Sequence, residues 1–121
     1  MMRSEAGSAV VEFALVLPLV LVLLFGIVEV AVIARSEIQL IHATREGARE
    51  AAASPDTARA ASAVRSALGG LASDARISVS RPAAVGQKAT VRVSVPYRVA
   101  TPIFGGFTVT LASSSSMRVE R

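Results

Sequence analysis

Two carboxylates lie in a stretch of the chain that is otherwise uncharged. Residues 8–34 contain no Lys, Arg or Asp, and their only charged side chains are Glu12 and Glu29. A lone acid within a membrane-spanning helix costs roughly 2.5–3.5 kcal/mol to insert, so such acids normally have a partner. In a helix the two carboxylates are about 25 Å apart along the axis. We therefore expect Glu29 to reach a membrane interface and Glu12 to require a partner.

The residues before Glu12 offer that partner. Cleavage after Gly7 would make Ser8 the new amino terminus and Glu12 the fifth residue of the shortened chain. A carboxylate one helical turn from a free amine is placed to pair with the amine of a neighbouring copy that is staggered along the axis. Such pairing offsets much of the cost of holding either charge in a low dielectric. The spacing therefore predicts a role for Glu12 in assembly and not in catalysis.

The composition argues against catalysis and against a bound metal. The 121 residues include no Cys and one His, His42, which is too few ligands for a zinc or thiolate site. The motifs GxxxxGK[ST], GxGxxG and HExxH are absent from the sequence, and the serines at 113–116 lack the His and acid that would activate a nucleophile. We expect no enzyme activity, no cofactor and no metal, with His42 on the surface or in packing contacts.

A long apolar helix must hold Glu12 and Glu29. Residues 8–34 would rise about 40 Å as a helix, enough to cross a hydrocarbon core of about 30 Å. Apolar side chains surround every face of this segment, which favours a transmembrane helix over the core helix of a soluble domain. Pro18 and Gly26 are tolerated in such helices at the cost of a local kink.

The predicted helix continues beyond the membrane through residues 35–53, with Gly47 as its weak point. Five residues of this segment recur on one side: Ile38, Ile41, Arg45, Ala48 and Ala52. From residue 35 onward the chain carries 12 of its 13 basic residues and 6 of its 9 acidic residues. The part after the span is therefore basic and water-facing.

The segment from Gly7 to Phe13, followed at once by a long apolar run, resembles the class III signal of the type IV pilin group, G-x-x-x-x-E-[FY]. The wider segment GSAVVEFALVLPLVLVLLFGIVEV resembles the TadE-like pseudopilins of tight-adherence (Flp) pilus systems, as do REGAREAA at 45–52 and SSSSMRVER at 113–121. The related TadF and TadG types open similarly. Phe13 stands where the major Flp pilins have Tyr, which fits a minor subunit.

The resemblance implies a minor pilin or pseudopilin, a structural or assembly-priming subunit of a pilus or related secretion machine, with a role in cell adhesion. Residues 1–7 would be a leader that a membrane prepilin peptidase removes after Gly7, exposing Ser8. Glu12, next to Phe13, would be the acid needed for processing or assembly. The implied partners are the membrane, the peptidase, other pilin subunits and the inner-membrane platform of the pilus.

The resemblance also implies an orientation in the cytoplasmic (inner) membrane, with the N-terminus in the cytoplasm and the C-terminal part outside. Arg35, Arg45 and Arg49 follow the span and would favour the opposite orientation under the positive-inside rule. That rule counts charges in loops shorter than about 60 residues, and the downstream part is longer. We therefore follow the orientation that the resemblance implies.

The pattern of residues 54–121 predicts that this part of the chain forms a small α+β head. Ser54 is expected to cap a second helix over 55–68, with an apolar stripe of Ala58, Ala61, Val64 and Leu68. Alternating apolar residues then predict strands over 77–80, 91–97 and 107–113, with a turn at 85–88 and a loop over 101–106. Pairing of the last strand is expected to run on through Met117 and Val119. Pro96 is expected to place the far end of the middle strand at an edge or beyond pairing. The fold class is α+β: a long transmembrane helix, then a pilin-like head with a second helix and a three-stranded antiparallel sheet.

Other interpretations of the sequence stay open. One is a conventional secretory signal cut before Arg35, although its apolar region would be too long and would contain an acid. Another is an uncut single-pass protein with an extracytoplasmic interaction domain. A third is a membrane-tethered basic module that binds a polyanion. No nucleic-acid partner is expected, because the arginines lack interleaved aromatic residues.

Overall fold

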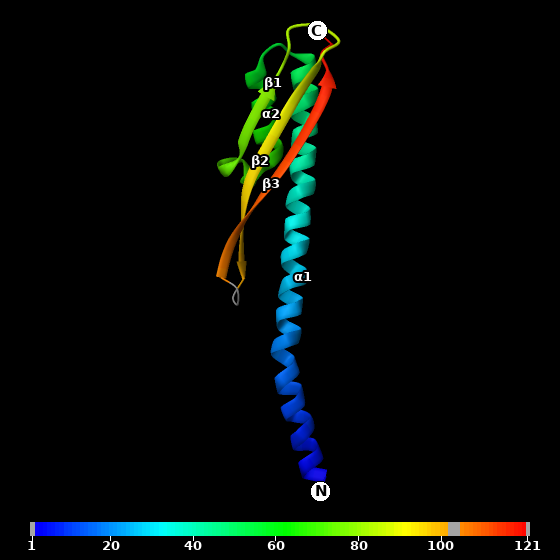
Figure 1. Ribbon diagram of the computed structural model, residues 1–121, viewed down its shortest axis with the longest axis vertical. Helices are drawn as coiled ribbons and strands as arrows, with labels where there is room; N and C mark the ends of the chain where they lie inside the picture. Colours follow the sequence, from blue (N-terminus) through cyan, green and yellow to red (C-terminus); the bar gives the residue numbers. More distant parts are fainter. Residues whose placement is uncertain (1, 102–104, 121) are drawn as a thin grey trace. The chain divides into compact units, whose positions relative to one another are not determined.

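A computed structural model of the chain describes residues 2–101 and 105–120 (Figure 1). The order of elements is α1 (Met2–Ala53), α2 (Thr57–Leu68), the 3-10 helix η1 (Gly69–Asp74), β1 (Arg76–Ser80), β2 (Lys88–Thr101) and β3 (Gly105–Arg118). The three strands form one antiparallel sheet in the order β1-β2-β3. This confirms the predicted α+β fold class. The chain divides into two compact units, Met1–Val32 and Ile33–Arg121.

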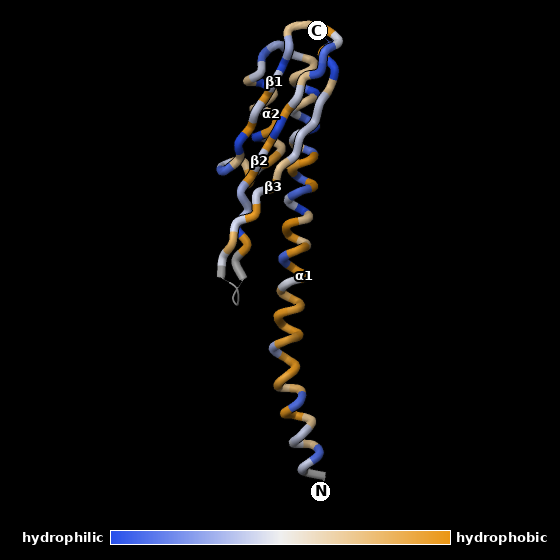
Figure 2. The backbone as a smooth tube through the Cα atoms, viewed as in Figure 1, coloured by the Kyte–Doolittle hydropathy of each residue, from blue (hydrophilic) through white to orange (hydrophobic). Residues whose placement is uncertain are grey.

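The first unit is the apolar part of α1. Its large side chains from Val10 to Val32 are mostly exposed, and hydrophobic colouring dominates this stretch in Figure 2. Pro18 lies inside the helix. Among the described residues α1 is the one helix long and apolar enough to cross a membrane, and its most apolar window is not buried within the chain. Such a surface fits a single-pass membrane protein, because lipid can cover side chains that the chain leaves bare.

The second unit has its core between helices and sheet. Leu40 and Ala43 of α1, Val64 of α2, and Val91 and Val93 of β2 belong to one buried cluster. The core of the head therefore includes one side of the long helix α1. A sheet with one apolar face needs such a cover, and only helices are available to supply it.

Within this core, the side of α1 on which Ile38, Ile41, Arg45, Ala48 and Ala52 recur is only partly buried. Ile38 is 57% exposed and Ile41 is 40% exposed, whereas Leu40 is 1% exposed. The other buried positions of α1 are small: Ser36, Ala43, Thr44, Gly47, Ala48, Ala51 and Ala52. Close packing therefore buries the small members of the repeat, Ala48 and Ala52. The isoleucines are left on the outside.

Gly47, which the sequence marks as the weak point of the long helix, is a packing contact in the head. A Cβ atom added to Gly47 would lie 2.3 Å from Cγ2 of Val64 and 3.3 Å from Cγ1 of Val91. Both α2 and the sheet therefore approach α1 where it has no side chain. One turn earlier, the buried hydroxyl of Thr44 donates a hydrogen bond to the carbonyl oxygen of Leu40, which satisfies it within the helix.

The second helix starts later than predicted, and its cap is a different residue. Its N-cap is Asp56, whose carboxylate accepts a hydrogen bond of 3.0 Å from the amide of Ala58. Ser54 lies before the helix and its hydroxyl accepts from the amide of Asp56 at 3.3 Å. Gly69, with φ of +57°, ends the helix as predicted.

The buried stripe of α2 is also shifted. Ala60, Val64 and Leu68 are buried, whereas Ala58 is exposed and Ala61 is half-buried. Residues spaced by four share one face of a helix, so Val64 and Leu68 draw Ala60 into the core with them. The prediction identified the two large members of the stripe and chose the wrong alanines.

The middle strand is longer than predicted, and the last strand runs on through Met117 to Arg118, close to the extension that the sequence suggested. Pairing of β2 with β3 runs from Lys88 opposite Arg118 to Thr101 opposite Gly105. Of the two alternatives expected at Pro96, the edge position is confirmed and the end of pairing is not, because Pro96 still pairs with Thr110. Pairing between β1 and β2 ends at Ser94, so β2 has an open edge at Pro96 and a missing amide donor is tolerated there.

The two connections between strands were predicted as a turn and a loop. The turn at 85–88 is confirmed, with Gly86 at φ of +91°. It is closed by a hydrogen bond of 3.0 Å from the amide of Gly86 to the carbonyl of Val119 and one of 2.8 Å from the amide of Val119 to the carbonyl of Gln87. Of the predicted loop over 101–106, the ends are strand, and residues 102–104 lie outside the described residues.

Candidate functional site

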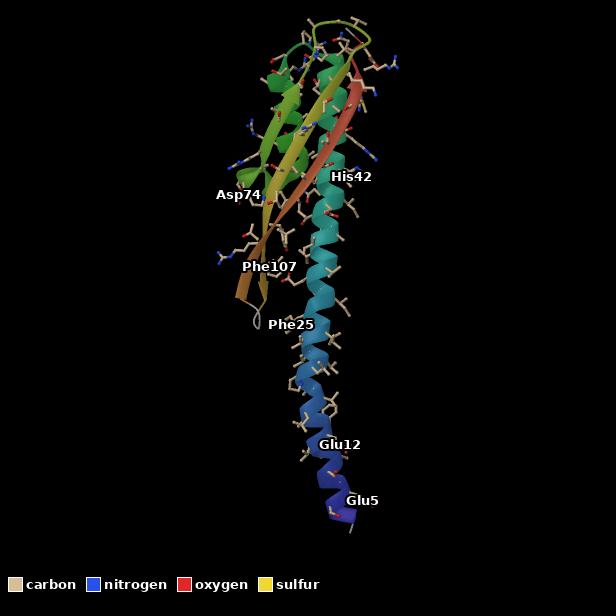
Figure 3. All side chains as sticks on the ribbon, viewed as in Figure 1. Glu5, Glu12, Phe25, His42, Asp74 and Phe107 are labelled. Atoms are coloured by element: carbon tan, nitrogen blue, oxygen red, sulfur yellow. The ribbon has the colours of Figure 1, made fainter. Side chains whose placement is uncertain are left out.

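The predicted site residues Gly7, Ser8, Glu12 and Phe13 all lie on α1 in the first unit. Glu12 is labelled in Figure 3. Each of these site residues is exposed, and Phe13 is 66% exposed. Ser8 and Glu12 are one helical turn apart, so they share a face of the helix and their backbones are separated by about 6 Å along the axis. Phe13 is rotated from Glu12 by about 100° and belongs to an adjacent face. The helix thus places Glu12 beside the position at which a new amino terminus would begin.

Gly7 is not required by the packing of this chain. A Cβ atom added there would meet nothing within 4 Å, in contrast to the crowded environment of Gly47 on the same helix. Glycine in a helix interior is less favourable than Ala by about 1 kcal/mol. The fold of this chain therefore does not explain why residue 7 is a glycine.

Glu29 is separate from Glu12. It is half-buried, whereas Glu12 is exposed, and the two are separated by about 25 Å of helix. Paired acid–base catalysis requires both groups within reach of one substrate, and the helix does not bring these two together. Their arrangement instead allows each carboxylate a different depth in a membrane.

The described residues contain no group of three or more His, Cys, Asp or Glu side chains that could hold a metal ion. His42 is exposed on the second part of α1 (Figure 3). The ion pairs nearest to it in sequence are Arg49–Glu46 at 3.9 Å and Arg59–Glu50 at 3.2 Å, both at least partly exposed. Exposed ion pairs contribute little to the free energy of folding, so these charged side chains mainly keep the surface of the head hydrated.

Sequence reasoning missed one feature of α1 that bears on function. The exposed Ile38 and Ile41 form an apolar strip on the helix where it belongs to the second unit, and the chain itself does not cover it. The small residues Ala43, Gly47 and Ala51, spaced by four, were the signal that could have revealed which side is buried. Small residues at that spacing let other elements approach a helix closely, which leaves larger side chains for the opposite side.

These features together define a class: a protein with one apolar helix able to span a membrane and an α+β, pilin-like head. Within that class, the family described as TadE-like protein matches residues 7–49. This confirms the resemblance noted in the sequence and supports a TadE-like protein of tight-adherence (Tad) pilus systems. The match begins at Gly7 and includes Ser8, Glu12, Phe13 and Glu29. Neither the curated proteins nor the solved structures contain a match to the chain.

Proposed function

We propose that this chain is a minor pilin or pseudopilin, a non-enzymatic structural or priming subunit of a tight-adherence pilus or a related secretion machine. The single observation that carries the proposal is the family match, which starts at Gly7 and covers the whole apolar part of α1. The function follows from what that segment offers to other molecules, namely a cleavable leader, an isolated acid and an uncovered apolar surface.

In this proposal α1 anchors the subunit in the inner membrane before assembly. The apolar part of α1 is exposed on all sides, and hydrocarbon or the helices of other subunits can cover it. The N-terminus faces the cytoplasm and the head lies outside. Glu29, at the end of the apolar part, is near the depth of an interface, where its charge costs less than at the centre of the bilayer.

Processing supplies the partner of Glu12. A prepilin peptidase removes residues 1–7 and leaves the positively charged amine of Ser8. The carboxylate of Glu12 then pairs with the corresponding amine of an adjacent pilin-type subunit, which neutralises both charges and sets the axial register. A matched pair in a low dielectric is much less costly than two isolated charges.

The exposed strip of Ile38 and Ile41 supports a second contact between subunits. It lies on α1 beyond the apolar segment, where the other side of the helix is buried against the head. Covering such side chains stabilises an interface by roughly 25 cal/mol for each Å² of apolar surface removed from water. A neighbouring helix packed along α1 would cover the apolar segment and the strip together.

The decisive experiment is to determine the mature N-terminus. The chain should be produced in membranes with the peptidase of its own system and, as control, with a catalytically inactive form of that peptidase. We expect intact-mass and N-terminal sequencing to give a start at Ser8 in the first sample and at Met1 in the second. A start at Met1 in both samples would contradict the proposal and leave an uncut membrane protein.

A further inference from the structure

The outer face of the sheet is strongly basic. Side chains alternate between the two faces of a strand, and the buried Val91, Val93 and Val95 identify the face toward the helices. The other face carries every charged residue of the three strands, all of them basic: Arg76, Lys88, Arg92, Arg98 and Arg118. We call this surface the basic sheet face.

This face accounts for most of the excess charge of the head. From residue 35 onward the chain has 12 basic and 6 acidic residues, and the strands contribute five of the basic ones and none of the acidic ones. Two ion pairs of the described residues, Arg49–Glu46 and Arg59–Glu50, both lie outside the strands. The helices and connections are therefore nearly balanced, whereas the sheet is not.

The register makes part of this face electrostatically unfavourable by itself. Lys88 of β2 lies directly opposite Arg118 of β3. Like charges at directly opposed positions destabilise a sheet. An anion bound between these two cations would relieve that repulsion.

Hydroxyl groups fill the space between the cations. Arg92 is flanked across the strands by Ser78 and Ser114, and Arg76 lies opposite Ser94. The hydroxyls of Thr90 and Ser116 are hydrogen-bonded to each other at 2.9 Å. A shallow depression runs across the three strands beside Arg76 and Arg92. The face therefore offers guanidinium groups for acidic groups and hydroxyls that both donate and accept.

Aromatic side chains are absent from the described part of this face. Tyr97 and Phe107 occupy alternate positions that belong to the opposite face. Single-stranded nucleic acids are held by stacking bases on aromatic side chains, so this surface lacks the feature they require. A polymer rich in both hydroxyl and acidic groups matches the face better.

We propose that the basic sheet face binds a carboxylated polysaccharide. Arginine presents a planar fork of donors that matches a carboxylate, and the serine and threonine hydroxyls match the hydroxyls of sugar rings. The proposal does not rest on leader cleavage or on pilus assembly, because the face belongs to the head alone. It assigns to the head a ligand that a purely structural subunit would not need.

The test uses the full chain in a neutral detergent and polygalacturonate immobilised on a sensor surface. We expect saturable binding that falls at least about tenfold between about 50 and 200 mM salt, and no binding to dextran, which is neutral. Arg92→Gln should weaken binding about tenfold, because it removes a charged donor at the centre of the face. Arg45→Gln, with the same charge change on an exposed part of α1, should alter binding less than about twofold.

Three results would overturn the proposal. One is the absence of binding to polygalacturonate. Another is an equal loss of binding in Arg45→Gln and Arg92→Gln, which would indicate net charge alone. The last is equally tight binding of double-stranded DNA, which would indicate a general polyanion surface. The circular dichroism spectra of the variants should match that of the parent chain, and Arg76→Gln provides a second variant on the same face should Arg92→Gln fold poorly.

Discussion

Gly47 of α1 and Val64 of α2 approach so closely that no side chain fits between them. The position at which a Cβ of residue 47 would lie is 2.3 Å from a methyl carbon of Val64. Gly7 and Gly26, on the same helix, have open space at the corresponding position. Glycines in one helix thus serve different purposes: one belongs to the core of the head, and the others do not.

Substitution of Gly47 by Val should destabilise the head. Overpacking of a core typically costs about 1–3 kcal/mol, and in a unit of this size each kcal/mol lowers the unfolding midpoint by about 4–8 °C. Thermal unfolding of the full chain in detergent, followed by circular dichroism, measures the change. Gly26→Val is the matched control in the same helix and should leave the midpoint of the head unchanged. Equal midpoints for the two variants would show that Gly47 is not a tight contact.

Substitution of Gly7 by Ala should leave the fold intact and reduce leader removal. The added methyl group meets nothing within 4 Å, so no packing is disturbed and helix propensity rises. The peptidase, however, needs close access to the backbone at this residue in the function that we propose. Intact-mass measurement after co-expression with the peptidase gives the uncut fraction, which should become the major species. Efficient cleavage of this variant would show that the peptidase does not need glycine at residue 7.

Substitution of Glu12 by Ala should improve membrane insertion and prevent subunit joining. Removing the acid lowers the insertion cost by roughly 2.5–3.5 kcal/mol, while the amine of the neighbouring subunit loses its partner. Crosslinking in membranes, scored as the yield of adducts with other pilin-type subunits, measures the effect. Glu29→Ala removes an acid from the same helix and should retain most of the adducts. Normal incorporation of the Glu12 variant would refute pairing between its carboxylate and an amine.

The side chains of Leu40 and Ile41 are neighbours in sequence and should respond differently to substitution. Leu40→Ala removes a side chain that is 1% exposed and should cost about 2–5 kcal/mol of head stability. Ile41→Ser changes a side chain that is 40% exposed and should alter that stability by about 0.5 kcal/mol or less. Crosslinking between subunits should instead fall for Ile41→Ser and more so for the double variant with Ile38→Ser. Undiminished crosslinking in the double variant would show that the strip of Ile38 and Ile41 is not part of the interface between subunits.

The sequence alone was sufficient to recognise the apolar helix, the isolated Glu12, the second helix and the three strands. These features depend on local periodicity and on charge, which are properties of short segments. It was also sufficient to recognise the TadE-like segment, because that segment is defined by residues next to one another. The cap at Asp56 was missed because Ser54 and Asp56 are both good capping residues, and only the path of the chain decides between them.

Which side of α1 is buried was decided only by the tertiary structure. Hydrophobic size favoured Ile38 and Ile41, but the space available between α1, α2 and the sheet favoured Gly47 and its small neighbours. Which of the basic residues share the basic sheet face was also decided by the structure. Its five cations are scattered over residues 76–118, and strand pairing brings them to one surface by placing Lys88 against Arg118 and Arg92 between two serines. Packing and register depend on contacts between distant segments, and no local pattern contains them.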